Sequence, residues 1–195
     1  MTPTSTTPDY VICLASASDA EPLLHLQRRL DRQSPFMMLE PDERDPDPER
    51  LHSRLAAQES TASFDLVAHL STGAASKPPQ LLGWLSVEVP PYRRAAHVGH
   101  LVLGVDDRFR ARGIGGALLA EAVALSASRG LARLELTVMT DNIRAIGLYL
   151  RHGFAVEGLR RQSLRREGAF VDEYLMSRIT EATTSLDDPA GTPGG

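Results

Sequence analysis

The sequence predicts a single α/β domain in which helices flank a central sheet. Three observations favour this fold class. Apolar runs with the character of strands alternate along the chain with segments of helical periodicity. A chain of 195 residues, of which 42% are hydrophobic, is long enough for one buried core and short for two. One apolar run also leads through a polar turn into a glycine-rich helix start, within residues 97–116.

The first half of the chain alternates strand-like and helix-like segments. Ser18 or Asp19 can cap a helix that carries leucines and ends near Gln33. Two later apolar runs are separated by Gly, Ala, Ser and Pro, so we expect them to form a hairpin across residues 72–79. The expected elements are a strand at residues 9–15, a helix up to residue 33, a helix near 48–59, and strands at 63–71 and 80–89.

The second half repeats this alternation around the glycine-rich segment. Gly130 is expected to end one helix, and Asp141 or Asn142 to cap the next. The expected elements are a strand at residues 98–105, a helix at 117–128, a strand at 133–140, a helix up to 152–153, and strands at 154–164 and 169–179.

The two ends of the chain are rich in Thr, Ser, Pro, Asp and Gly and show no apolar periodicity. Such a composition cannot bury enough apolar surface to fold. We therefore expect residues 1–8 and 181–195 to be disordered and residues 9–180 to form the domain.

Composition and charge limit the possible partners. A formal net charge of −4 and a pI near 5.9 give no basic excess, so neither a nucleic acid nor an anionic membrane surface is expected as a partner. No apolar run approaches the roughly 20 residues of a membrane span, and the N-terminus lacks the features of a signal peptide. We expect a cytoplasmic protein without a metal.

The glycine-rich stretch has the properties of a pyrophosphate site. Glycines in the first turn of a helix let a ligand approach the backbone, and the free N–H groups there favour an anion. Arg110 and Arg112 can add charge-assisted hydrogen bonds. The alternative is a tight turn beside two solvated arginines. The spacing matches neither a P-loop nor the G-x-G-x-x-G of a dinucleotide fold.

Residues 110–115, Arg-Ala-Arg-Gly-Ile-Gly, have the spacing R-x-x-G-x-G/A and resemble the acyl-CoA-binding motif of the GNAT N-acetyltransferase superfamily. Residues 134–158, LELTVMTDNIRAIGLYLRHGFAVEG, resemble the next strand and helix of that superfamily. The resemblance implies that the central sheet is mixed and mostly antiparallel, that it has about seven strands, and that acyl-CoA binds where the fourth and fifth strands splay apart. It also implies an acetyl-CoA-dependent N-acetyltransferase, and relatives in this family often form homodimers.

The resemblance assigns cofactor contacts to three segments. In the family, a bulged strand leaves backbone groups free for pantetheine, and Gly104 is a candidate for the bulge or for the end of the strand. The implied cofactor-binding residues are Leu103, Gly104, Val105, Arg110, Ala111, Arg112, Gly113, Ile114, Gly115, Gly116, Asn142 and Tyr149.

The chemistry requires a proton donor for the leaving thiolate. Tyr149 is suited to this role because a phenol titrates near pH 10 and a thiol near 8.5. Asn142 and Tyr149 are seven residues apart, close to two helical turns, so they share one helix face. By the resemblance, Asn142 holds pantetheine and Tyr149 protonates the sulfur. The alternative for Tyr149 is core packing.

The attacking amine must also lose a proton, and here several side chains are possible. The candidates for the base are Glu88, His97, His100, Asp172 and Glu173, of which we favour Glu88. Cys13, the single cysteine, is expected to be a small core residue and not an acyl carrier. Direct attack in a ternary complex is therefore preferred over a covalent acetyl-enzyme.

The acceptor is expected to be a small primary amine. Residues 168–176 match the Gly-x-x-Val-Asp-x-x-x-Met ending of the GNAT branch that acetylates amino acids and other small amines. The resemblance places Phe36, Met37, Met38 and Glu40 near the substrate, although Phe36 and Met38 can instead be core residues and Glu40 a solvated acid. Glu88, the favoured base, is also expected to bind the substrate. Four arginines can bind a substrate carboxylate or form a solvated hairpin: Arg160, Arg161, Arg165 and Arg166. Acetylation of a protein N-terminus or lysine, and a non-catalytic acyl-CoA-binding module, remain alternatives.

Overall fold

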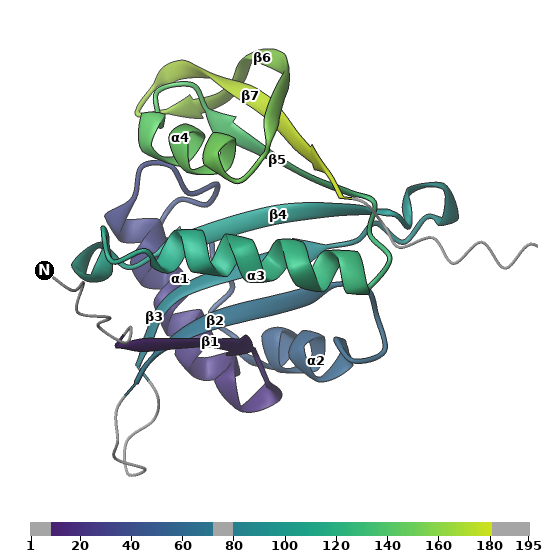
Figure 1. The fold of residues 1–195 in the computed structure, drawn as a ribbon. Helices are drawn as coiled ribbons and strands as arrows, with labels where there is room; N and C mark the ends of the chain where they lie inside the picture. Colours follow the sequence, from purple (N-terminus) through teal and green to yellow (C-terminus); the bar gives the residue numbers. More distant parts are fainter. Residues whose placement is uncertain (1–8, 72–79, 181–195) are drawn as a thin grey trace, which may run out of the picture.

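The computed structural model describes residues 9–71 and 80–180 of the chain. These residues form seven strands and four α-helices (Figure 1). The disorder expected for both ends and the hairpin loop expected at residues 72–79 lie outside the described residues. In chain order the elements are β1 (Tyr10–Leu14), α1 (Ala20–Gln33), α2 (Glu49–Ala57), β2 (Phe64–Leu70), β3 (Leu81–Glu88), β4 (Val98–Val105), α3 (Ile114–Ser128), β5 (Arg133–Met139), α4 (Ile143–Arg151), β6 (Ala155–Arg166) and β7 (Ala169–Ile179).

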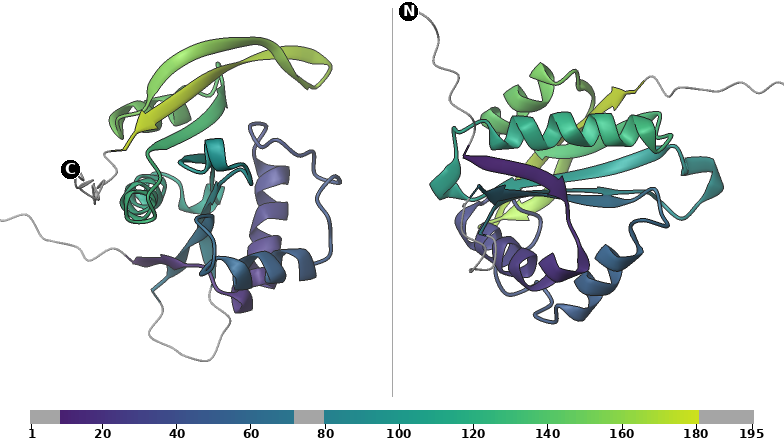
Figure 2. Two further views of the ribbon diagram at one scale, coloured as in Figure 1. Left: turned by 90° about the vertical axis from the view of Figure 1, so that its right-hand side faces the viewer. Right: turned by 60° about the horizontal axis from the view of Figure 1, so that its bottom comes forward.

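The seven strands form one sheet in the order β1-β2-β3-β4-β5-β7-β6. Every neighbouring pair is antiparallel except β4 and β5, which are parallel. Helices α1 and α2 cover one face of the sheet and α3 covers the other (Figure 2). The predicted mixed, mostly antiparallel sheet between helices is confirmed.

Two apolar clusters fill the spaces between the sheet and its helices. Leu23, Leu26 and Leu30 lie on one face of α1 and pack with Val67 and Trp84 of β2 and β3. On the other face, α3 contributes its own buried leucines and alanines to the larger cluster. Because β2 and β3 have helices on both sides, their side chains are buried in both directions, and their sequences are almost continuously apolar.

The parallel pair β4 and β5 is joined only at its start. Residues 98–100 of β4 pair with residues 133–135 of β5. Beyond this point β4 remains paired with β3 as far as Val105, and β5 remains paired with β7 as far as Met139. The strands therefore part, and within residues 9–71 and 80–180 no strand lies beside the edge of β4 that faces β5. This confirms the predicted splay between the fourth and fifth strands.

Two sequence predictions about single residues are wrong. Gly104 does not form a bulge, because the register between β3 and β4 is unbroken from end to end. The glycine is required by packing: a Cβ atom at this position would lie 2.5 Å from Cδ1 of Leu30 on α1. Cys13 is not a core residue but is exposed. It lies on the edge strand β1, whose alternate residues Val11 and Cys13 point away from the core.

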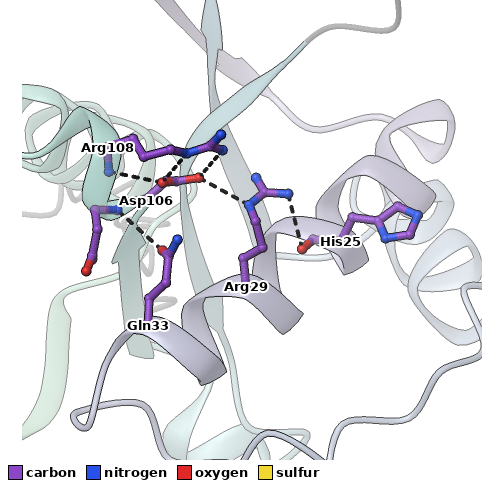
Figure 3. Close-up of polar contacts among 6 residues, drawn as sticks. His25, Arg29, Gln33, Asp106 and Arg108 are labelled. Carbon is purple, nitrogen blue, oxygen red and sulfur yellow. Dashed lines mark hydrogen bonds and ion pairs between the residues drawn. The ribbon is translucent and has the colours of Figure 1, made fainter.

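A buried carboxylate fixes the end of β4 to α1 (Figure 3). Asp106 is fully buried and follows β4 directly, and its backbone N–H donates to the carbonyl of Leu82 at 2.9 Å. Its side chain accepts hydrogen bonds from Arg29 Nε of α1 at 3.1 Å and from Arg108 Nη2 at 2.7 Å. These hydrogen bonds outweigh the effect of burial and lower the pKa of Asp106 to about 2.

This pKa predicts how the Asp106 charge stabilises the fold. One pKa unit corresponds to about 1.4 kcal/mol, so the charge contributes about 2 kcal/mol to the free energy of unfolding at neutral pH. Because the folded pKa is lowered, this contribution is present above the unfolded pKa near 4 and is lost as the pH falls toward 2. We expect Asp106→Asn to lower the free energy of unfolding by about this amount at pH 7 and by clearly less at pH 3, measured by urea denaturation. The neighbouring Asp107→Asn is the matched control, and an equal effect of Asp106→Asn at both pH values would contradict the assignment.

Candidate active site

A cavity of about 510 Å³ opens where β4 and β5 part. One wall is the unpaired edge of β4, residues 101–105, and the facing wall is residues 137–139 of β5 together with part of α4. The turn before α3 closes one end, and residues 34–38, which follow α1, border it from the other face of the sheet. The cavity therefore lies between elements from both halves of the sheet.

The turn before α3 presents a row of free backbone N–H groups. Gly113 has φ +80° and Ala111 has φ +63°, so two left-handed residues fold the chain back before the helix begins at Ile114. The helix starts three residues earlier than the sequence predicts. Across the described part of the chain, no residue accepts a hydrogen bond from the N–H groups of residues 111–116. Consecutive free N–H groups at a helix start form a concave binding site for an anion.

The two arginines of this turn differ in their relation to the cavity. Arg110 lines it and forms an ion pair with Asp107. Arg112 does not line it: its Nη1 lies 2.9 Å from Oδ2 of Asp9, and its guanidinium stacks on the ring of Phe109 at 5.3 Å. Both side chains are almost half exposed, so they are available to an anion that approaches from solvent.

Asn142 and Tyr149 both line the cavity from α4, as their spacing predicts. Asn142 caps the helix: its Oδ1 accepts from the N–H of Ala145 at 3.3 Å, which leaves its Nδ2 as a donor. Tyr149 is only 7% exposed and packs against the ring of Phe154 at a centroid distance of 5.8 Å. Burial raises the pKa of Tyr149 to about 12, so its hydroxyl keeps its proton at neutral pH.

The structure does not bring Glu88 to the cavity. Because β3 runs antiparallel to β4, the end of β3 that carries Glu88 lies opposite His100, where β4 and β5 are still paired. Its carboxylate accepts from Arg54 Nη1 at 2.9 Å and is largely exposed. His100 lies at the same end, with Nδ1 3.1 Å from Glu135. The choice of Glu88 as base and substrate ligand is therefore corrected.

Other substrate-side predictions agree better with the structure. Phe36 and Met37 line the cavity, and the guanidinium of Arg166 stacks over the ring of Phe36 at 5.4 Å. Glu173, which the sequence offered only as one of several possible bases, also lines the cavity and is 3% exposed. The sequence could not single out Glu173 because the register between β5 and β7 is not visible in it. In the structure this register places Glu173 opposite Met139, at the end of β5 that borders the cavity.

The described residues contain neither a metal-binding cluster nor a membrane-spanning helix. In residues 9–71 and 80–180, no group of three or more His, Cys, Asp or Glu side chains is arranged to hold a metal ion. None of the helices described is both long and apolar enough to cross a membrane.

Residues 28–154 match the sequence model of the Acetyltransferase (GNAT) family. Two curated relatives match the chain over shorter stretches. L-amino acid N-acetyltransferase AaaT from Escherichia coli is 35% identical over 100 residues, which is 51% of this chain and 62% of that protein. N-alpha-acetyltransferase RimI from Mycobacterium tuberculosis is 42% identical over 89 residues, 46% of this chain and 51% of the relative. The aligned part of the chain thus covers less than two thirds of the length of each of these two relatives.

The fold also matches solved structures. The structure of yncA from Salmonella typhimurium, solved with its cofactor acetyl-CoA, superposes with a TM-score of 0.78 and covers 92% of this chain and 99% of that one. At 15% sequence identity this likeness shows the fold alone. The family match covers β4, the turn with free N–H groups, β5 and α4, which together build the cavity. The chain belongs to the GNAT acetyltransferase family.

Proposed function

We propose that this protein transfers an acetyl group from acetyl-CoA to the primary amine of a small molecule, such as an amino acid. The observation that carries the proposal is the cavity between β4 and β5, which joins a row of free N–H groups to an unpaired strand edge and a protonated tyrosine. Together they can bind the pyrophosphate, the pantetheine arm and the thioester of acetyl-CoA.

The donor binds along this path. Its pyrophosphate lies on the N–H groups of residues 111–116, where the helix dipole of α3 also favours an anion. Its pantetheine arm lies in the cavity and pairs with the open edge of β4, residues 101–105, whose backbone groups would otherwise lack partners. Asn142 Nδ2 donates to a pantetheine carbonyl. The thioester then lies near the Tyr149 hydroxyl.

The transfer proceeds by direct attack of the amine on the thioester carbonyl. An acyl-cysteine intermediate is not supported, because Cys13 is the single cysteine of the chain and lies on the edge strand β1, outside the cavity. The thiol of CoA is a stronger acid than the phenol of Tyr149, so the leaving thiolate does not remove the phenol proton and remains a hydrogen-bond acceptor. A tyrosine that keeps its proton therefore stabilises the sulfur as the C–S bond breaks.

The similarity to the E. coli amino acid N-acetyltransferase supports a small acceptor. The similarity to RimI favours one second candidate, acetylation of a protein N-terminus. The two can be separated by comparing thiol release with free amino acids, with small amines and with short peptides that carry a free N-terminus. Turnover with peptides alone would favour the second candidate.

The cofactor path predicts an effect of one glycine. A Cβ atom at Gly115 would point at Leu148, Val105 and Leu103, with contacts of 3.4 to 3.9 Å, and so into the path proposed for pantetheine. Wild-type protein is expected to gain about 2.7 kcal/mol of stability when acetyl-CoA is present at about 100 times its dissociation constant. We expect Gly115→Val to lose most of this gain, measured as the shift of the thermal midpoint.

The matched control for Gly115→Val is Gly158→Val on β6, where a Cβ atom meets no other atom within 4 Å. This variant should keep the full shift with acetyl-CoA. A full shift in Gly115→Val, or no shift in wild-type protein with acetyl-CoA in large excess, would contradict the proposed binding path.

The role of Tyr149 predicts a loss of turnover without a loss of binding. Tyr149→Phe removes the proton donor but keeps the packing against Phe154, so the thermal shift with acetyl-CoA should persist. The rate of CoA release with a primary amine should fall by about 10²- to 10⁴-fold, the usual contribution of a positioned acid. Tyr174→Phe, which changes a tyrosine outside the cavity lining, serves as the control. Unchanged turnover in Tyr149→Phe would remove the residue from this role, and cofactor binding without amine-dependent CoA release would indicate a non-catalytic module.

A further inference from the structure

Glu173 is the one carboxylate among the described residues that line the cavity. Its side chain is 4% exposed. In the described part of the chain, its carboxylate has one hydrogen-bond partner, Arg160 Nη1, at 3.3 Å from Oε2. Arg160 itself is half exposed and reaches Glu173 from the neighbouring strand β6.

A buried carboxylate with a single hydrogen bond has fewer hydrogen-bond partners than it can accept. Ionised carboxylates accept about four hydrogen bonds, and buried ones are nearly always paired and fully bonded, because burial without partners is costly. Glu173 has one long hydrogen bond, and its Oε1 accepts none from residues 9–71 and 80–180. A cationic ligand in the cavity would supply the missing partner.

Strand register places Glu173 on the opposite face of the sheet from Tyr149. Directly paired residues share a face, and the pair Val138 and Tyr174 packs with Tyr149 on the side of α3 and α4. Met139 and Glu173 are the next pair along β5 and β7, so they point to the other side. The donor path and Glu173 therefore approach the opening between β4 and β5 from opposite faces.

Two arginines of β6 lie on that face: Arg160 is bonded to Glu173, and Arg166 lies over the ring of Phe36 and 3.4 Å from Sδ of Met139. The cavity-lining side chains around Glu173 are otherwise apolar. Phe36, Met37, Met139 and Leu164 line the cavity there and can accommodate an apolar body. A molecule with an ammonium group and an apolar body would satisfy both the carboxylate and this wall. The ammonium would lie at the opening between the strands, where the thioester of the donor is proposed to end.

We propose that Glu173 binds the ammonium group of the acceptor and takes one of its protons, and that the acceptor is a primary amine on an apolar body. The proposal rests on the proposed function. The neutral nitrogen forms a bond to the acetyl carbon, and the C–S bond breaks with its electron pair on sulfur. The amide nitrogen gives up its second proton, which passes through the Tyr149 hydroxyl to the sulfur, so that Tyr149 is protonated before and after the transfer, and Glu173 releases its proton to solvent. The products are an N-acetyl amine, free CoA and one proton.

The test compares two acceptors of the same shape. Phenethylamine is an ammonium ion at neutral pH, whereas O-benzylhydroxylamine, which has oxygen in place of one CH₂ group, is already a neutral amine. We expect Glu173→Gln to keep the thermal shift with acetyl-CoA. It should lower kcat/KM for phenethylamine by about 100-fold or more, and for O-benzylhydroxylamine by less than about 10-fold.

Two further variants make the result interpretable. Glu167→Gln removes the same charge from the exposed turn between β6 and β7 and should leave both acceptors unaffected. Glu173→Met replaces the buried carboxylate with an apolar side chain of similar size, which can pack against Met139. Because a buried charge is removed, the thermal midpoint should rise. Turnover of phenethylamine should be lost. This variant provides the same comparison if Glu173→Gln does not fold.

Equal losses for the two acceptors, or no loss for either, would overturn the role of Glu173. Wild-type turnover of amino acids or peptides but of neither probe would overturn the assignment of an apolar amine. Acetyl-CoA binding without turnover of any amine would instead refute the proposed function, and this proposal with it.

Discussion

The separation of β4 from β5 is the constraint on which the site depends. The two strands pair over three residues at their start and then each remains bound to its other neighbour. Asp106 fixes the end of β4 to α1 through Arg29, while the backbone N–H of Thr140 fixes the end of β5 to Asp172 of β7 at 3.0 Å. Because each end is held by its own half of the sheet, the strands cannot close the gap, and a cavity forms there.

The free backbone groups in this gap explain how the main chain itself can bind a ligand. Strand edges and helix starts normally have their polar groups satisfied by neighbouring residues or solvent. Here the edge of β4 and the start of α3 face one cavity, so a ligand that carries amides and phosphates can supply the partners. In the proposed mechanism the side chains then have limited tasks: Tyr149 stabilises the leaving sulfur, and Glu173 receives the acceptor.

The order of elements could be predicted from the sequence because local patterns determine it. Apolar runs, caps and glycines predicted every strand and α-helix of the described chain within a few residues, but not the short 3₁₀ helices at residues 17–19, 93–95 and 107–109. Residues whose environment depends on distant partners could not be assigned in this way. Gly104 is small because Leu30 of α1 approaches it, and no pattern around residue 104 records that contact.

The choice of a base failed for the same reason. From the sequence we favour Glu88 over Glu173, although each lies in an expected strand and no local pattern separates them. Strand pairing separates the two carboxylates. Glu88 of β3 lies opposite the start of β4 and is on the surface, whereas Glu173 of β7 lies opposite the end of β5 and is in the cavity. Cys13 shows the same limit, because a strand pattern does not tell which side of an edge strand is covered.

The most direct measurement of the central claim is the change in the backbone amide signals of residues 111–116, followed by two-dimensional NMR as acetyl-CoA is added. If these free N–H groups hold the pyrophosphate, their signals should shift most and move downfield as new hydrogen bonds form, together with signals from residues 101–105 on the edge of β4. Saturating shifts elsewhere in the chain, with residues 111–116 unchanged, would show that the cofactor binds at another place and would contradict this account of the site.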